Sequence, residues 1–196
     1  MSVVTNERAG EQRILNVPNQ LTALRLLLSV VLFVLIDLEY YLAATTVFVV
    51  AASTDWLDGY WARKYGQVTN LGRILDPFVD KIIVCGTFIF LAALPTSGVR
   101  PWMAVVVVGR ELLVTALRSY LEGEGADFSA KMSGKLKMAV QCLAAILSLY
   151  ALSLGAVENR GDALDAALVA SVWAAVLLTL YSGAAYVRRA ILLLKR

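Results

Sequence analysis

Long apolar stretches alternate with short polar segments along all 196 residues of the chain. Six of these stretches, with their polar extensions, approach the roughly 20 residues that a helix needs to cross a membrane. Apolar runs of this length favour helices over strands. The pattern predicts an all-α fold, an integral membrane bundle of six transmembrane helices at residues 21–36, 40–64, 71–94, 101–121, 131–154 and 163–187.

Turn-forming and polar residues separate the predicted helices. Pro18 breaks the chain before the first apolar run, and Asn19 or Thr22 can cap the helix that follows. An acidic turn at residues 37–39 ends this helix. We therefore expect a short N-terminal interfacial segment, residues 1–18, and one membrane domain, residues 19–196.

The composition agrees with a membrane protein and narrows its chemistry. Hydrophobic residues make up 59% of the chain and the mean hydropathy is +0.70, which is too apolar for an ordinary soluble domain. The chain has no histidine, so a histidine general base and histidine-bound zinc are excluded. Cys85 and Cys142 lie inside predicted helices without metal-ligand spacing. We expect membrane lipid as a partner and no nucleic acid.

The placement of positive charge predicts the orientation of the bundle. Six spans put both termini on one side of the membrane, together with the second–third and fourth–fifth connections. Of the eighteen lysines and arginines, Arg100 and Arg160 fall on the other side, which leaves sixteen on the first. Positive charge beside the spans marks the cytoplasmic side. We expect a multi-pass protein of the cell membrane, with its termini and active site facing the cytoplasm.

Four aspartates stand between the second and third apolar runs. An ionised carboxylate at membrane depth costs about 2.5–3.5 kcal/mol on insertion scales, and four together repel one another. Members of each pair are three or four residues apart and so share a helix face, with small residues beside them. Such a hard-oxygen cage suits one or two divalent cations, Mg²⁺ or Mn²⁺. The aspartates are Asp55, Asp58, Asp76 and Asp80, and the small residues are Gly59, Ala62 and Gly72.

The aspartates and their neighbours form a spaced motif that resembles the signature of the CDP-alcohol phosphatidyltransferases. The match covers every fixed position and its spacing, and the six-helix architecture of that family would cover the whole chain. The fixed positions are Asp55, Asp58, Gly59, Ala62, Arg63, Gly72, Asp76 and Asp80.

Within that family, three further stretches resemble the members that make phosphatidylglycerophosphate. They begin at Val17, Arg110 and Gly134 and read VPNQLTALR, RELLVTALR and GKLK. Small departures occur at Phe78 and Val79, where leucine and alanine are expected, and again beyond Arg110 and Gly134; none touches the aspartates. The resemblance implies transfer of the phosphatidyl group of CDP-diacylglycerol to the C1 hydroxyl of sn-glycerol 3-phosphate, with release of CMP.

The resemblance also implies roles for single residues. Two metal ions would be bound by the four aspartates, and Asp80 would in addition deprotonate the attacking hydroxyl. Arg63 suits the phosphates of the donor, and the small residues let the nucleotide approach the helix backbone. The metal ligands are Asp55, Asp58, Asp76 and Asp80, and the donor-binding positions are Asp58, Gly59, Ala62, Arg63 and Gly72.

Basic residues on the fourth and fifth helices are candidates for binding the phosphate of the acceptor. Clustered guanidinium and ammonium groups suit a dianion. Positive charge flanking the spans explains several of them equally well, and Arg110 could instead pair with Glu111, which reads as a structural partner of an arginine. Lys135 and Lys137 are two apart and face different sides of a helix, so we expect at most one of them to contact the phosphate, and we favour Lys135. The candidates are Arg110, Thr115, Arg118, Lys135 and Lys137.

Other functions compete with this interpretation. The same reaction could use inositol phosphate, serine or phosphatidylglycerol as the acceptor. The acids could form the path of a cation transporter, although they lie near one membrane face and no inverted repeat is visible. A prenyltransferase that binds Mg²⁺ through its aspartates is a third alternative, but it would not explain why Gly59, Ala62 and Arg63 occur at these positions. The resemblance further implies a homodimer, and we expect a bacterial source.

Overall fold

The computed structural model describes residues 17–65, 70–123 and 132–194, apart from the side chains at 17–19, 21, 55–65, 70–77, 80, 122–123, 132–133, 135 and 194. Six α-helices and one short 3₁₀-helix, without any strand, make up these described ranges. This confirms the all-α prediction and the number of helices. The helices are α1 Val17–Asp37, α2 Tyr41–Tyr65, α3 Asn70–Ala93, α4 Pro101–Gly123, α5 Met132–Ser153 and α6 Asp162–Leu194, with η1 Val157–Asn159 before α6.

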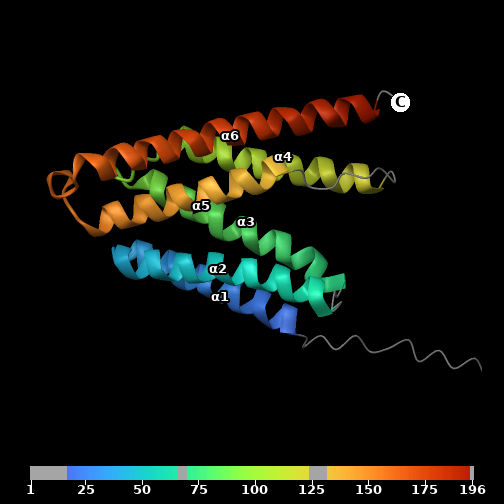
Figure 1. The fold of residues 1–196 in the computed structure, drawn as a ribbon, viewed down its shortest axis with the longest axis horizontal. Coiled ribbons are helices and arrows are strands. Elements are labelled where there is room, and N and C mark those ends of the chain that lie inside the picture. Colours follow the sequence, from blue (N-terminus) through green and yellow to red (C-terminus); the bar gives the residue numbers. More distant parts are fainter. Residues whose placement is uncertain (1–16, 66–69, 124–131, 195–196) are drawn as a thin grey trace, which may run out of the picture.

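Successive helices run in opposite directions along the bundle (Figure 1). The start of α1, the end of α2, the start of α3 and the end of α6 lie at one end, which we call the motif end. The end of α4 and the start of α5 lie there too. The tight turns after α1, α3 and α5 lie at the opposite end, which we call the turn end. The described helix ends that flank the termini and the second–third and fourth–fifth connections therefore lie together, as predicted.

Two helix ends differ from the prediction. The first helix begins at Val17 and runs through Pro18 and Asn19, so the predicted break and the capping by Asn19 or Thr22 are wrong. Proline is tolerated there because N–H groups in the first turn have no partner inside the helix. The sixth helix continues to Leu194, seven residues beyond the predicted end. Of the predicted interfacial segment, residues 1–18, the first sixteen residues lie outside the described residues.

The acidic turn ends α1 as predicted. Glu39 has a φ of 63°, in the left-handed region, and the backbone N–H of Tyr40 donates to the carbonyl of Leu35 at 2.8 Å. This bond satisfies a carbonyl left without a partner at the helix end. The chain then turns sharply into α2, which packs against α1. The local sequence therefore specifies the first helix pair.

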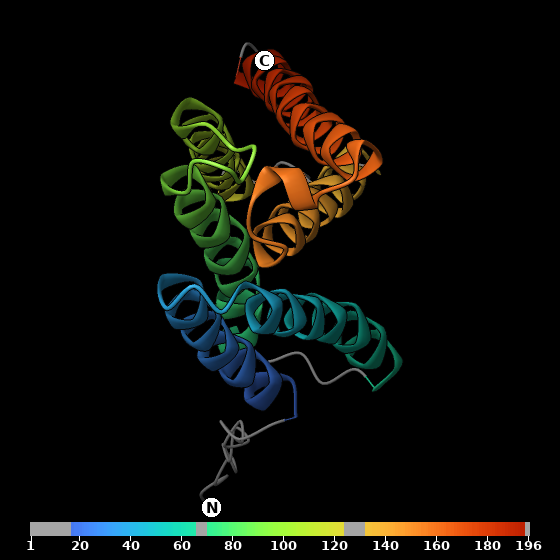
Figure 2. The same ribbon diagram turned by 90° about the vertical axis from the view of Figure 1, so that its left-hand side faces the viewer.

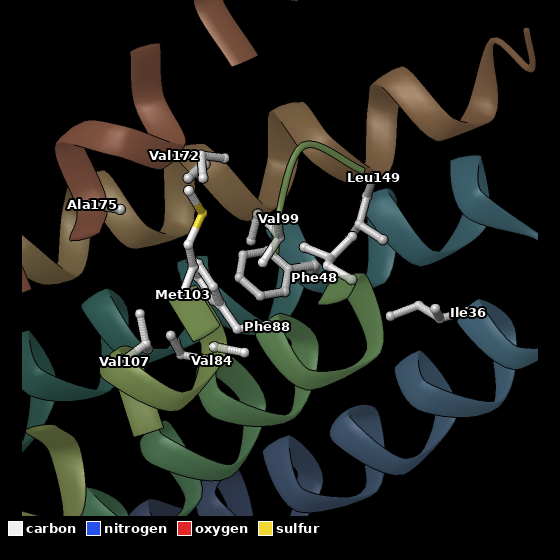
Figure 3. Close-up of a cluster of buried hydrophobic side chains, with 14 of the residues drawn as sticks. Ile36, Phe48, Val84, Phe88, Val99, Met103, Val107, Leu149, Val172 and Ala175 are labelled. Atoms are coloured by element: carbon white, nitrogen blue, oxygen red, sulfur yellow. The ribbon is translucent and has the colours of Figure 1, made fainter. Parts of the chain in front are cut away.

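The six helices share one apolar core (Figure 3). Phe48 of α2 and Phe88 of α3 are fully buried within it, and α4 contributes Met103. The third helix contacts α1, α4 and α5, and α5 also packs on α2 and α6, so these two helices join the α1–α2 pair to the α4–α6 pair (Figure 2). Several alanines are fully buried in this core, and such small residues let helices approach closely in an apolar medium. They include Ala44, Ala51, Ala144, Ala145 and Ala175.

Hydroxyl side chains inside the helices are satisfied by the helix backbone. The hydroxyls of Ser29, Thr45 and Thr87 each donate to the carbonyl four residues earlier, at 2.7–2.8 Å. Exposed hydroxyls on α2 do the same: Ser53 donates to Val49 and Thr54 to Val50. Such internal pairing suits helices surrounded by an apolar medium, where water cannot serve as the partner.

Large apolar side chains cover much of the outer surface. Val105 is 70% exposed, Leu112 65% and Leu27 64%, and similar residues follow along all six helices. Within the described residues, two helices are long and apolar enough to cross a membrane, at Leu136–Ser153 and Asp162–Leu193. Shorter apolar segments occur at Tyr41–Thr54 and Lys81–Ala93. An outer surface this apolar is unusual for a soluble monomer.

Candidate active site

The four aspartates of the motif lie on two consecutive helices at the motif end. Asp55 and Asp58 are in the last three turns of α2, and Asp76 and Asp80 in the first half of α3. Both stretches are helical, so each pair shares one face of its helix, as the spacing predicts. The side chains of these aspartates lie outside the described residues, and so do the predicted donor-binding positions Gly59, Ala62, Arg63 and Gly72.

Arg110 of α4 is held from two helices. Its Nη1 donates to Oε1 of the neighbouring Glu111 at 3.1 Å, and its Nη2 donates to the hydroxyl of Ser182 on α6 at 2.6 Å. Its guanidinium carbon lies 5.4 Å from the centre of the Tyr186 ring, a cation–π distance. Gly183 permits this approach, because a Cβ there would lie 3.1 Å from Arg110 Cγ. Arg110 is therefore locked between α4 and α6.

Lys137 of α5 reaches the same carboxylate. Its Nζ donates to Oε1 of Glu111, and these side chains are only 6% and 10% exposed. The prediction that Glu111 pairs with an arginine is thus confirmed, with Lys137 as an additional partner. Two cations share one carboxylate, so these three side chains carry one positive charge in excess. A buried excess charge costs several kcal/mol unless another ion compensates it. We call Arg110, Glu111, Lys137 and Ser182 the basic cluster.

Lys81 connects the basic cluster to the acidic helix α3. Its Nζ donates to the hydroxyl of Thr115 on α4, and that hydroxyl donates to the backbone carbonyl of Glu111 at 2.6 Å. Since Asp80 directly precedes Lys81, the basic cluster lies beside the aspartate-bearing part of α3. A hydroxyl has one hydrogen to donate, so Thr115 as placed here holds Lys81 and has no second hydrogen for a phosphate.

The remaining acceptor candidates flank this cluster. Arg118 lies two turns beyond Arg110 on α4 and is half-buried. The Nε atoms of both arginines are buried and have no hydrogen-bond partner among the described residues. Buried N–H groups without a partner are costly, and an anion would satisfy them. The side chain of Lys135 lies outside the described residues, so its predicted contact with the acceptor remains a prediction, whereas Lys137 is placed in the cluster.

The contribution of α6 was missed in the sequence. Ser182, Gly183 and Tyr186 form one side of the basic cluster, although small and aromatic residues at helical spacing are typical of ordinary packing. Tyr186 is 5% exposed and packs with Val114 in a small apolar cluster between α4 and α6. The available signal was the run of four small residues that begins at Ser182 and Gly183 and ends before Tyr186. That signal does not identify an arginine as the neighbour.

An apolar groove elsewhere on the protein does not coincide with this site. It encloses about 550 Å³ between the end of α3 and the first half of α4, towards the turn end. Its lining residues are all apolar and provide no group for binding a nucleotide or a phosphate. The lining residues are Ile89, Ala92, Ala93, Pro101, Ala104, Val105, Val108 and Gly109.

Comparisons with known proteins agree with the motif. The sequence profile of the CDP-alcohol phosphatidyltransferases matches residues 15–181. A CDP-diacylglycerol–glycerol-3-phosphate 3-phosphatidyltransferase of Bacillus subtilis (strain 168) is 34% identical over 187 residues, covering 87% of this chain and 93% of the relative. Enzymes of the same name from Rickettsia typhi and Pseudomonas fluorescens are 32% identical over 178 residues and 42% identical over 110 residues. The match to the Rickettsia typhi enzyme covers 87% of this chain and 94% of the relative, and the match to the Pseudomonas fluorescens enzyme covers 55% of this chain and 56% of the relative. The chain belongs to the CDP-alcohol phosphatidyltransferase family.

Proposed function

We propose that the protein transfers the phosphatidyl group of CDP-diacylglycerol to the C1 hydroxyl of sn-glycerol 3-phosphate. The products are phosphatidylglycerophosphate and CMP. Family membership supports the reaction class, and the names of the relatives from Bacillus subtilis, Rickettsia typhi and Pseudomonas fluorescens support glycerol 3-phosphate as the acceptor. A chain of this kind contributes to the synthesis of anionic phospholipids.

One observation supports an acceptor that bears a phosphate, and the names of the relatives favour glycerol 3-phosphate over inositol phosphate. Arg110 and Lys137 share the single carboxylate of Glu111 in a buried cluster, which leaves positive charge in excess beside the aspartate-bearing helix. A neutral acceptor alcohol such as serine or inositol brings no anion that would compensate this charge fully. The dianionic phosphate of glycerol 3-phosphate does, through charge-assisted hydrogen bonds. The buried Nε atoms of Arg110 and Arg118 are further donors that a phosphate would satisfy.

The reaction is a direct displacement at phosphorus without a covalent enzyme intermediate. Asp80 accepts the proton of the C1 hydroxyl while that oxygen attacks the β-phosphorus of the donor. The new oxygen–phosphorus bond replaces the bond to CMP, which leaves with the bonding electrons. Arg63 binds the donor phosphates, while Arg110, Arg118, Lys135 and Lys137 hold the acceptor phosphate so that its hydroxyl faces the donor.

The aspartates fit a divalent metal by the chemistry of their donor atoms. Carboxylate oxygens are the ligands that Mg²⁺ and Mn²⁺ prefer, and both carboxylate pairs lie on continuous helix, which keeps each pair on one face. Bound metal would neutralise the negative charge that builds up on the pyrophosphate oxygens as its bond breaks. We assign two ions to the four carboxylates, Asp55, Asp58, Asp76 and Asp80.

We further propose that the six helices all cross the cell membrane of a bacterium, with the motif end facing the cytoplasm. The apolar outer surface and the concentration of lysine and arginine at that end support this orientation. Glycerol 3-phosphate then enters from the cytoplasm, while the acyl chains of the donor stay in the bilayer. The family resemblance supports a homodimer.

The test is CMP release by the purified full-length chain in lipid nanodiscs with CDP-diacylglycerol and Mg²⁺. Glycerol 3-phosphate, inositol phosphate, inositol, serine and phosphatidylglycerol are supplied one at a time, with and without a metal chelator. We expect release with glycerol 3-phosphate alone, and none in the presence of the chelator. Release with another acceptor would overturn the acceptor assignment, and release in the chelator would overturn the metal assignment. A folded protein without release under any condition would contradict the transferase itself.

A further inference from the structure

The basic cluster has an unusual hydrogen-bond arrangement. Arg110 and Lys137, from α4 and α5, both donate to the same oxygen, Oε1 of Glu111. These two cations would otherwise repel each other in a buried setting. The shared oxygen therefore fixes the distance between them. Ser182 of α6 fixes the other arm of the Arg110 guanidinium at 2.6 Å.

The carboxylate does not use up the donors that a phosphate needs. A guanidinium has five N–H groups, and Arg110 spends one on Glu111 and one on Ser182. An ammonium has three, and Lys137 spends one on Glu111. Several donors remain on each cation, including the buried Nε of Arg110, which has no partner among the described residues. Glu111 and a phosphate can therefore be bound by the two cations at the same time.

We propose that Glu111 and Ser182 are positioning residues that hold Arg110 and Lys137 in the geometry required by the acceptor phosphate. The inference rests on the proposed function and deepens it, because it explains how a flexible arginine and lysine form one defined anion site. Neither positioning residue needs to touch the substrate. Their loss should therefore weaken acceptor binding specifically, while the donor site on α2 and α3 is unaffected.

We call the holding of Arg110 and Lys137 by Glu111 and Ser182 the clamp. Three variants test it by different routes. Glu111→Gln removes the charge and keeps an accepting oxygen. Glu111→Asp keeps the charge but is one methylene shorter, so it cannot bridge both cations in the same way. Ser182→Ala removes the support from α6 without breaking the ion pairs. Ser171→Ala, on the same helix, is the matched control, because the Ser171 hydroxyl is also buried and donates only to the backbone of its own helix.

The kinetic readout separates positioning from folding. We expect both Glu111 variants to raise the KM for glycerol 3-phosphate about 10-fold, because a charge-assisted hydrogen bond to the cations is lost or misplaced. Ser182→Ala should raise it about 5-fold, because Arg110 loses its support from α6. The KM for CDP-diacylglycerol should change less than twofold, and Ser171→Ala should match the unaltered chain. A merely structural role would instead lower kcat through a smaller folded fraction and leave both KM values unchanged. That result, or a normal KM in Glu111→Asp, would overturn the inference.

A second readout does not depend on activity. Cys85 lies one helical turn beyond Lys81 on α3, and Lys81 donates to Thr115 beside the basic cluster, whereas Cys142 packs against the apolar core. Alkylation at each cysteine is followed by mass spectrometry while inorganic phosphate or glycerol 3-phosphate is titrated. Phosphate should slow alkylation at Cys85 and not at Cys142. The phosphate concentration that gives half-maximal protection should be about 10-fold higher in the Glu111 variants.

This second readout keeps the two proposals distinguishable. If the unaltered chain releases no CMP with glycerol 3-phosphate but phosphate still protects Cys85 and the variants shift that protection, the proposed acceptor is wrong and the clamp stands. If phosphate gives no protection, or equal protection in every variant, the clamp is wrong whatever the acceptor proves to be. Should the Glu111 variants not fold, the comparison of Ser182→Ala with Ser171→Ala decides between these outcomes.

Discussion

The acidic and basic halves of the candidate site are built in different ways. Each aspartate pair occupies one face of one helix, and the whole motif lies within two consecutive helices. The basic cluster instead draws Arg110 and Glu111 from α4, Lys137 from α5 and Ser182 from α6. In sequence, its members are separated by as many as 72 residues. The acidic half is therefore readable from spacing, whereas the basic half exists only once the helices have packed.

This difference separates two kinds of charged site in an apolar protein. The carboxylates carry like charges, and in the proposed function metal ions from outside the chain compensate them. The basic cluster contains its own counter-ion, Glu111, and is only partly neutralised by it. A site of the first kind should depend on metal for its integrity, and one of the second kind should persist without its anion. The following predictions address the acidic half, the basic half and finally the turn end, beginning with the largest expected effect.

Asp80→Asn should abolish catalysis. Its amide keeps the size of the side chain but cannot accept the proton of the attacking hydroxyl, and general-base catalysis contributes about 10²–10⁴-fold. CMP release with saturating substrates measures the effect. Asp37→Asn is the matched control, an exposed carboxylate at the turn end of α1. Equal activity in the Asp80 variant and the control would contradict the role of Asp80.

Arg110→Lys should lower kcat/KM for glycerol 3-phosphate about 100-fold, which corresponds to about 2.7 kcal/mol. Lysine keeps the charge but cannot bond Glu111 and Ser182 together or lie as a planar group over Tyr186. Initial rates with varied acceptor and constant donor measure it.

Arg188→Lys, an exposed position on α6, serves as the control for this exchange. A wild-type kcat/KM in Arg110→Lys would show that the site needs only a point charge. In that case the fixed geometry of the cluster would have no bearing on acceptor binding.

Gly183→Ala should have a smaller effect on the same parameter, about fivefold in the KM for glycerol 3-phosphate. The added Cβ would meet Arg110 Cγ at 3.1 Å, so the arginine has to shift by a few tenths of an ångström. Gly109→Ala is the control, because a Cβ added on α4 beside Arg110 meets nothing within 4 Å. A change of equal size in both variants would point to helix propensity rather than crowding.

Arg160→Lys should affect stability and leave the kinetics alone. At the turn end, Arg160 donates to the carbonyl and hydroxyl of Thr96 and to the carbonyl of Gly155, joining the turns after α3 and α5. Losing part of this fork should cost about 1–2 kcal/mol, visible as a lower Tm in thermal unfolding of the nanodisc-bound chain. Both KM values should remain within twofold of the unaltered chain. A raised acceptor KM would show that the two ends of the bundle are coupled.

Much of the fold follows from the sequence because its signals are local. Apolar runs of spanning length predicted six helices, and all six helix ends nearest the turns lie within one residue of the prediction. The first helix was placed too late, because proline in a first turn is compatible with a helix as well as with a break. The sixth was ended too early at its arginines, because charged residues continue a helix readily once the chain has left the apolar layer.

The sequence by itself determined the family, the all-helical architecture and the acidic motif, because each depends on residue type and on spacing along one helix. Only the tertiary structure decided which side chains surround Arg110 and Lys137. Arg110 could have faced lipid, a substrate or an acid, and spacing alone does not tell these apart. Packing of α4 against α6 brings it to Ser182 and Tyr186, and Lys137 of α5 reaches its neighbour Glu111. Contacts between helices depend on how whole faces fit together, which no single stretch of sequence encodes.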